Sequence, residues 1–103
     1  MADIQRIPPQ NLDAEMSLLG AILIDQDAML KIVDAIDAED FYKKAHRDIF
    51  VTMRELYDKS EPIDVLTLGN RLREKEQLES AGGNAYILEL STSVPTSSHI
   101  EQY

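Results

Sequence analysis

The chain has 103 residues, the size of one small domain, and its 19 acidic and 10 basic side chains give it a formal net charge of −9. Nucleic-acid affinity rests largely on lysine and arginine neutralising phosphates, so this balance argues against a domain that grips DNA by itself. Without cysteine the chain can form neither disulfides nor thiolate zinc sites. It also shows no secretory signal and no apolar run near the roughly 20 residues that cross a bilayer, so we expect a soluble, cytoplasmic domain.

The first predicted helix follows Pro8-Pro9, because prolines suit a helix start. Its apolar side chains recur at helical spacing and predict one buried stripe. Glu15 falls at the flank of this stripe, so we expect its carboxylate at the boundary between core and solvent. Residues 1–7 are expected to be a flexible tail, and residues 8–103 one helical unit. The predicted stripe consists of Leu12, Met16, Leu19 and Leu23.

Four further helices are predicted, and local start and stop signals separate them. Pro62 ends the third helix, since a residue before proline is pushed out of the helical region. Asp64 is a good N-cap for the fourth, and Gly82-Gly83 makes a turn before the fifth. Ser98 begins a capping box, which predicts a sixth helix from about His99. The four helices are expected over residues 28–36, 45–59, 65–76 and 84–91.

Each of these helices carries an apolar face that we assign to the core. Large aromatic side chains, Phe41 and Tyr42, are expected to anchor the acidic connection before the third helix. Phe50 and Tyr57 are expected at the edge of that helix's face. The predicted core faces are Met29, Val33 and Ile36; Ala45, Ile49, Met53 and Leu56; Val65, Leu68 and Leu72; and Ile87, Leu88 and Leu90.

No stretch of the sequence predicts a strand. There is no clean period-two alternation and no Asn-Gly or Asp-Gly hairpin turn. The fold class is therefore predicted to be all-α, a compact orthogonal bundle of five to six short helices. Because the sequence ends at Tyr103, just after a helix start, we expect it to be a piece of a longer protein.

The residues capable of chemistry do not form a recognisable catalytic or metal site. No phosphate-cradling loop is present, and the two histidines, His46 and His99, lie in different segments. Acidic residues between Asp34 and Asp40 lack the spacing and central glycine of a calcium loop. His46 shares a face with core residues, so we interpret it as a hydrogen-bonded core histidine. No catalytic residue, cofactor site or metal site is predicted in this chain.

Two residues are candidates for partner binding. Glu15 either stabilises the start of its helix electrostatically or contacts a partner. Tyr86 is either a core residue or an interface residue, since one side of tyrosine is apolar and its tip is polar. The cluster of Arg71, Arg73 and Lys75 is interleaved with glutamates and is interpreted as an ion-paired solvent face, not a nucleic-acid site.

An ordered set of short motifs resembles the N-terminal domain of DnaB-type replicative DNA helicases. The resemblance covers residues from about Ile7 to Tyr103, and each motif alone is weak. The motifs are Pro8-Pro9-Gln10-Asn11-Leu12-Asp13-Ala14-Glu15, Leu18-Leu19-Gly20-Ala21-Ile22-Leu23, Glu39-Asp40-Phe41-Tyr42 with His46-Arg47 and Ile49, Pro62-Ile63-Asp64, Leu66-Thr67-Leu68, Gly82-Gly83, Ala85-Tyr86-Ile87 and Ser93-Val94-Pro95-Thr96.

The resemblance implies a small helical head that, in the family, precedes a long helical hairpin. Hairpins pair between subunits to build a collar of three dimers on a hexameric ring, and the collar receives the C-terminal helicase-binding domain of primase. A RecA-like motor uses ATP and Mg²⁺ to move along single-stranded DNA. The hairpin, linker, Walker motif and arginine finger do not occur in these residues, so the resemblance implies that ATP, Mg²⁺ and single-stranded DNA belong to the rest of the parent protein. It places subunit assembly and primase docking here, with no membrane contact, and Glu15 and Tyr86 are the predicted contact residues.

Two other function classes fit the same residues. A free-standing acidic helical adaptor or a protein that mimics the charge of DNA fits the composition. A carboxylate–metal hydrolase fits less well, because its carboxylates lack a convergent histidine partner.

Overall fold

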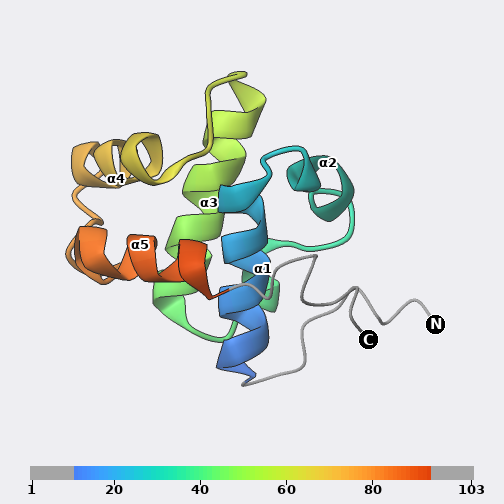
Figure 1. Ribbon diagram of the computed structural model, residues 1–103, viewed down its shortest axis with the longest axis horizontal. Helices are drawn as coiled ribbons and strands as arrows, with labels where there is room; N and C mark the ends of the chain where they lie inside the picture. Colours follow the sequence, from blue (N-terminus) through green and yellow to red (C-terminus); the bar gives the residue numbers. More distant parts are fainter. Residues whose placement is uncertain (1–10, 94–103) are drawn as a thin grey trace.

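The computed structural model describes residues 11–93, and these residues form helices without any strand (Figure 1). The expected tail at residues 1–7 and the expected sixth helix near His99 lie outside the described residues. The all-α prediction is confirmed. The elements in chain order are α1 (Leu12–Ile24), α2 (Ala28–Ile32), the 3₁₀ helix η2 (Ala38–Asp40), α3 (Lys44–Asp58), α4 (Val65–Glu74) and α5 (Gly83–Thr92).

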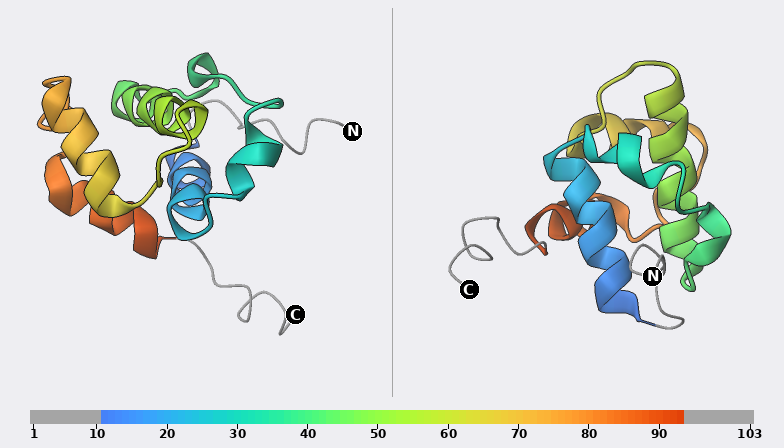
Figure 2. Two further views of the ribbon diagram at one scale, coloured as in Figure 1. Left: turned by 90° about the horizontal axis from the view of Figure 1, so that it is seen from above. Right: turned by 90° about the vertical axis from the view of Figure 1, so that its right-hand side faces the viewer.

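The helices pack at steep angles to one another. Helices α1 and α3 run side by side, whereas α4 and α5 cross them on one side and α2 lies on the other (Figures 1 and 2). Helix α5 packs against both α1 and α4, and α4 packs against α3. The arrangement is the orthogonal bundle that the sequence predicted.

Two of the helices begin at a residue whose side chain caps them, whereas α3 does not. Asn11 accepts a hydrogen bond from Ala14 N–H at 3.0 Å at the start of α1, and Asp64 accepts one from Thr67 N–H at 2.7 Å at the start of α4, as predicted. Helix α3 begins after Lys43, which supplies no side-chain cap. The first turn of α3 is therefore open to an acceptor from elsewhere in the molecule.

Helix α2 is shorter than its sequence pattern predicts. It spans only Ala28–Ile32, and the chain continues in turns to Ile36. Asp27 at its start makes no side-chain capping bond. A helix this short depends on packing, and Met29 and Ile36 are buried as predicted. Gln26 ties the preceding turn to the α3–α4 connection, because its Oε1 accepts the backbone N–H of Ile63 at 3.0 Å.

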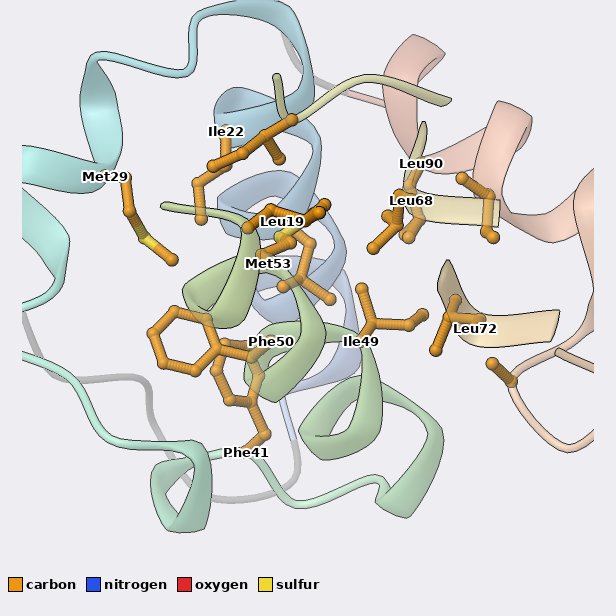
Figure 3. Close-up of a cluster of buried hydrophobic side chains, with 14 of the residues drawn as sticks. Leu19, Ile22, Met29, Phe41, Ile49, Phe50, Met53, Leu68, Leu72 and Leu90 are labelled. Carbon is orange, nitrogen blue, oxygen red and sulfur yellow. The ribbon is translucent and has the colours of Figure 1, made fainter. Parts of the chain in front are cut away.

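A single hydrophobic core lies where the helices cross (Figure 3). The buried face of α1 is rotated from the predicted stripe: Leu12 is 38% exposed, and Met16 and Leu23 are only partly buried. Spacing alone could not choose the buried side, because α1 is apolar around most of its circumference. The large, fully buried core side chains are Leu19, Ile22, Met29, Phe41, Ile49, Phe50, Met53, Leu56, Leu68, Leu72, Ile87 and Leu90.

The predicted burial of two aromatic residues and one leucine is wrong. Phe50, expected at the edge of its helix face, is fully buried and its ring centroid lies 5.2 Å from that of Phe41. Tyr42, expected as an anchor beside Phe41, is 58% exposed. Leu88, expected in the core, is 56% exposed, because α5 turns Ile87 and Leu90 inward and Leu88 lies on the opposite side of that helix.

Candidate functional site

Three residues that the sequence singled out separately meet in one hydrogen-bonded chain. Glu15 on α1, His46 on α3 and Tyr86 on α5 are brought together from positions 31 and 40 residues apart. His46 Nδ1 lies 2.7 Å from Glu15 Oε1, and His46 Nε2 lies 2.6 Å from the Tyr86 hydroxyl. We call this chain of side chains the Glu15–His46–Tyr86 relay. It joins three helices through the interior of the bundle.

Glu15 is fully buried, at 0% exposure, and not at the boundary where the sequence placed it. Its Oε2 accepts the backbone N–H of Tyr42 at 2.6 Å, and its Oε1 lies 3.5 Å from the N–H of Lys43. The carboxylate therefore stands at the uncapped start of α3, where the helix dipole favours negative charge. Glu15 does stabilise a helix start electrostatically, but the helix is α3 and not its own.

His46 is a hydrogen-bonded core histidine, as predicted, and is 0% exposed. Burial lowers the pKa of His46 below 6.5, with Lys43 adding to the effect, although the hydrogen bond and negative charge of Glu15 act in the opposite direction. The imidazole is therefore neutral at pH 7. A carboxylate only accepts hydrogen bonds, so Nδ1 carries the proton and donates to Glu15. Nε2 must then accept, and the Tyr86 hydroxyl donates to it.

Tyr86 is the one member of the relay that is not fully buried. Burial, together with the charges of Glu89 and Glu15, raises the pKa of Tyr86 above 10.0, so its hydroxyl keeps its proton. The ammonium group of Lys43 lies 4.8 Å from the centroid of its ring. Gly82 packs so closely that a Cβ atom there would come within 2.6 Å of Tyr86 Cβ. Tyr86 is thus held at its hydroxyl, its ring and its stem.

The order of groups in the relay resembles a catalytic triad, but its histidine is fully buried. A catalytic base must reach a proton on a substrate, and His46 is 0% exposed inside the bundle. Within residues 11–93, no three acidic, histidine or cysteine side chains converge as metal ligands. Through the two contacts of His46 the relay links α1, α3 and α5 and sets the position of the Tyr86 hydroxyl.

A second polar cluster links α3 to α4 near the surface. Glu55 pairs with Lys75 at 3.2 Å and with Arg71 at 3.6 Å, and Lys75 also donates to Thr52 Oγ1 at 2.8 Å. The predicted pairing of this basic stretch with its own glutamates occurs once, between Arg71 and Glu74 at 3.4 Å. Lys75 and Arg71 instead serve mainly to bridge two helices. We call Glu55, Arg71, Lys75 and Thr52 the α3–α4 network.

Several large apolar side chains stay on the surface of this acidic domain. Helical spacing predicted a core position for some of these side chains and gave no prediction for others. Spacing alone does not show which face of a helix is covered by another helix. None of the helices in the described part of the chain is long and apolar enough to span a membrane. The most exposed apolar side chains are Leu66 at 73%, Ile24 at 61%, Leu30 at 59%, Tyr42 at 58% and Leu88 at 56%.

Comparisons with known proteins agree on one family. Residues 7–103 match the sequence profile described as DnaB-like helicase N terminal domain. The chain is 41% identical over 99 residues to the replicative DNA helicase DnaB of Geobacillus stearothermophilus, and 45% identical over 97 residues to that of Pasteurella multocida. These matches cover 96% and 94% of this chain but only 22% and 21% of the helicases, so the chain spans about a fifth of their length.

A solved structure supports the same assignment. The crystal structure of the N-terminal domain of DnaB helicase from Mycobacterium tuberculosis superposes with a TM-score of 0.82 and 34% sequence identity. The match covers 90% of this chain and 65% of the other. The sequence profile, the curated helicases and the fold together show that the chain belongs to the DnaB-like helicase N-terminal domain family.

Proposed function

We propose that this domain is the N-terminal collar of a replicative DNA helicase and that it acts as a protein-interaction module without catalytic activity. The observation that carries the proposal is the contrast between a closed interior and the large apolar side chains that remain exposed on the surface. The groups that could do chemistry bind one another inside the bundle, whereas Leu66, Leu30 and Leu88 stay exposed on an acidic surface. Each of these side chains would have apolar area removed from water if a partner protein covered it, which would favour binding.

The assembly in which the domain works follows from the same proposal. Other helicase subunits and the C-terminal helicase-binding domain of primase are its partners, in the bacterial cytoplasm. Unwinding, ATP and Mg²⁺ belong to a motor elsewhere in the parent protein, and single-stranded DNA is bound by the assembled ring. A net charge of −9 supports this division, because an acidic collar repels DNA phosphates.

The partner-contact role of Glu15 and Tyr86 also stays a proposal, with different parts for the two residues. Tyr86 reaches the surface of α5 and is available for direct contact. Glu15 is fully buried and acts only through the residues that it positions.

A calorimetric titration of the 103-residue chain with the purified primase domain tests the docking function. We expect saturable binding that Leu88→Ser weakens by about tenfold, since loss of one well-buried contact costs on the order of 1.4 kcal/mol. Leu30→Ser is the matched control, because Leu30 is equally exposed but lies on α2, on the other side of the bundle (Figure 1). Tight binding of single-stranded DNA at about 0.15 M salt, or ATP turnover by the chain, would overturn the proposal. If only a longer piece with the hairpin bound primase, docking would belong to the hairpin.

A further inference from the structure

The direction of the hydrogen bonds in the relay limits what Tyr86 can offer to a partner. Glu15 only accepts, so His46 donates from Nδ1, and its Nε2 has a lone pair but no proton. The Tyr86 hydroxyl must therefore use its single proton to donate the hydrogen bond to His46 Nε2. What remains at the Tyr86 oxygen is acceptor capacity alone.

The neighbours of Tyr86 on α5 favour a cationic partner group. Glu89 lies one turn further along the helix, so its carboxylate is a neighbour of Tyr86, and its charge acts on the tyrosine hydroxyl. Glu89 is exposed, so a partner group can reach its carboxylate. Lys43 covers the ring of Tyr86, so a second cation would approach from the Glu89 side.

We propose that the Glu15–His46 pair holds the Tyr86 hydroxyl as a donor toward the interior, so that the Tyr86 oxygen, beside Glu89, accepts a hydrogen bond from a lysine or arginine N–H group of the docking partner. The inference rests on the proposed docking function and adds the chemistry of the contact. Glu15 and His46 are positioning residues in it, since neither reaches the surface.

The same geometry makes the contact sensitive to acid. When His46 is protonated, Nε2 becomes a donor, the Tyr86 oxygen accepts, and the hydroxyl proton turns outward toward the partner's own N–H. The groups that face His46 are Glu15 from α1, Lys43 from the segment before α3, and Tyr86 from α5, with the Phe41 ring at an edge. Glu15 favours the protonated form, whereas Lys43 and burial oppose it.

Glu15→Gln should reverse the relay without changing its shape. The backbone N–H of Tyr42 can only donate, so the glutamine oxygen must keep the position of Glu15 Oε2. The amide NH₂ group then faces His46 Nδ1 and donates to it. His46 shifts its proton to Nε2 and donates to Tyr86, which leaves the tyrosine proton free to point outward.

Nitrogen NMR of the full 103-residue chain reads this reversal without any partner. We expect the Nδ1–H tautomer of His46 in the wild type and the Nε2–H tautomer in Glu15→Gln. Asp13→Asn is the matched control, because it removes the same charge from an exposed position of α1, and it should leave the tautomer unchanged. An Nε2–H tautomer in the wild type, or no change in Glu15→Gln, overturns the relay.

Calorimetry with the primase domain tests the contact itself. We expect Glu15→Gln and Tyr86→Phe each to weaken binding by about tenfold, as for loss of one charge-assisted hydrogen bond. The double variant should bind no more weakly than Tyr86→Phe alone, because both changes remove the same bond. Wild-type affinity should fall only as the pH drops below 6.5, because burial lowers the pKa of His46 in the folded chain below that value, and the affinity of Tyr86→Phe should not follow it.

The outcomes separate this inference from the docking function. If Glu15→Gln lowers stability but leaves the affinity of the folded chain and its pH profile unchanged, the relay is only structural and the inference is wrong while docking stands. If the wild-type chain does not bind the primase domain, the proposed docking function and the proposed Tyr86 contact are both wrong. The NMR result alone then decides whether the hydrogen bonds of the relay have the stated direction.

Discussion

The Glu15–His46–Tyr86 relay and the α3–α4 network both tie helices together through polar groups, but they do so in different environments. Glu15 and His46 are 0% exposed. In the α3–α4 network the side chain of Glu55 is 38% exposed, and those of Arg71 and Lys75 are 23% and 24% exposed. Thr52 is buried, but water can reach the three charged side chains of the network and replace a lost partner, whereas in the relay it cannot do so without opening the core.

This difference decides which cluster the fold depends on. A buried polar group left without a partner loses its hydration with no compensation, which makes deletion in the relay costly. An ion pair near the surface is screened and its partners return to water, which makes deletion in the network mild. The number of ion pairs is therefore a weaker guide to stability than burial.

Glu15→Ala should cause the largest loss. It leaves His46 Nδ1 and the Tyr42 N–H without an acceptor in the interior, and we expect the free energy of unfolding to fall by about 3 kcal/mol. Urea unfolding followed by circular dichroism measures it. Asp13→Ala, on the exposed side of the same helix, should change little. A loss from Glu15→Ala no larger than that of the control would remove the distinction between the two clusters.

Gly82→Ala should cause the second-largest loss of stability, because Gly82 packs directly against the side chain of Tyr86. Its φ of +104° disfavours a side chain, and the new Cβ would lie 2.6 Å from Tyr86 Cβ. We expect a loss of about 2–3 kcal/mol from the strain and the displaced tyrosine. Gly83→Ala is the matched control, since its φ is +78° but nothing lies within 4 Å of the added Cβ, and about 1 kcal/mol is expected. Equal losses in thermal unfolding would show that Tyr86 is not held there.

How far the sequence could predict this molecule depends on whether the signal is local. Pro62, Asp64 and Gly82-Gly83 act on their immediate neighbours, so the ends of α3, α4 and α5 were placed within about two residues of their observed positions. The length of α2 was overestimated, because its apolar spacing continues to Ile36 although the chain leaves the helix at Val33. No residue between them carries a strong stop signal.

The contacts within the relay could not be predicted from local sequence signals. Glu15, His46 and Tyr86 each stood out in the sequence, but separations of 31 and 40 residues carry no local sign of their contact. Their meeting is a result of how α1, α3 and α5 cross. One clue could have placed Glu15 in the interior. Glu15 lies one helical turn before the apolar Leu19, and Lys43 at the start of α3 offers no side-chain cap of its own.

The pH dependence of stability sharpens the comparison, because only the relay contains a histidine. Burial lowers the pKa of His46 below the 6.5 of the unfolded chain. As the pH falls through 6.5 the unfolded chain takes up the proton first, so the free energy of unfolding decreases until the pKa of the folded state is reached. The slope should not exceed about 1.4 kcal/mol per pH unit.

Comparison of the wild type with His46→Gln isolates this effect, since His99 is present in both proteins. Urea unfolding at a series of pH values from about 7.5 to about 5.5 should show a decline in the wild type that is absent from the variant. Parallel curves would mean that folding does not change the proton affinity of His46.

The smallest effect is expected from Glu55→Gln in the α3–α4 network. The change removes the charge that pairs with Arg71 and Lys75, but Lys75 keeps its hydrogen bond to Thr52 and Arg71 keeps Glu74. We expect a loss of about 0.5–1 kcal/mol at low salt that shrinks at about 1 M NaCl, where the Debye length is about 3 Å. Lys44→Gln, which breaks the exposed pair between Lys44 and Asp48, should cost less still, because the Lys44 side chain is 71% exposed. A loss from Glu55→Gln that matched Glu15→Ala and ignored salt would mean that water does not reach the network, and the two clusters would then be equivalent.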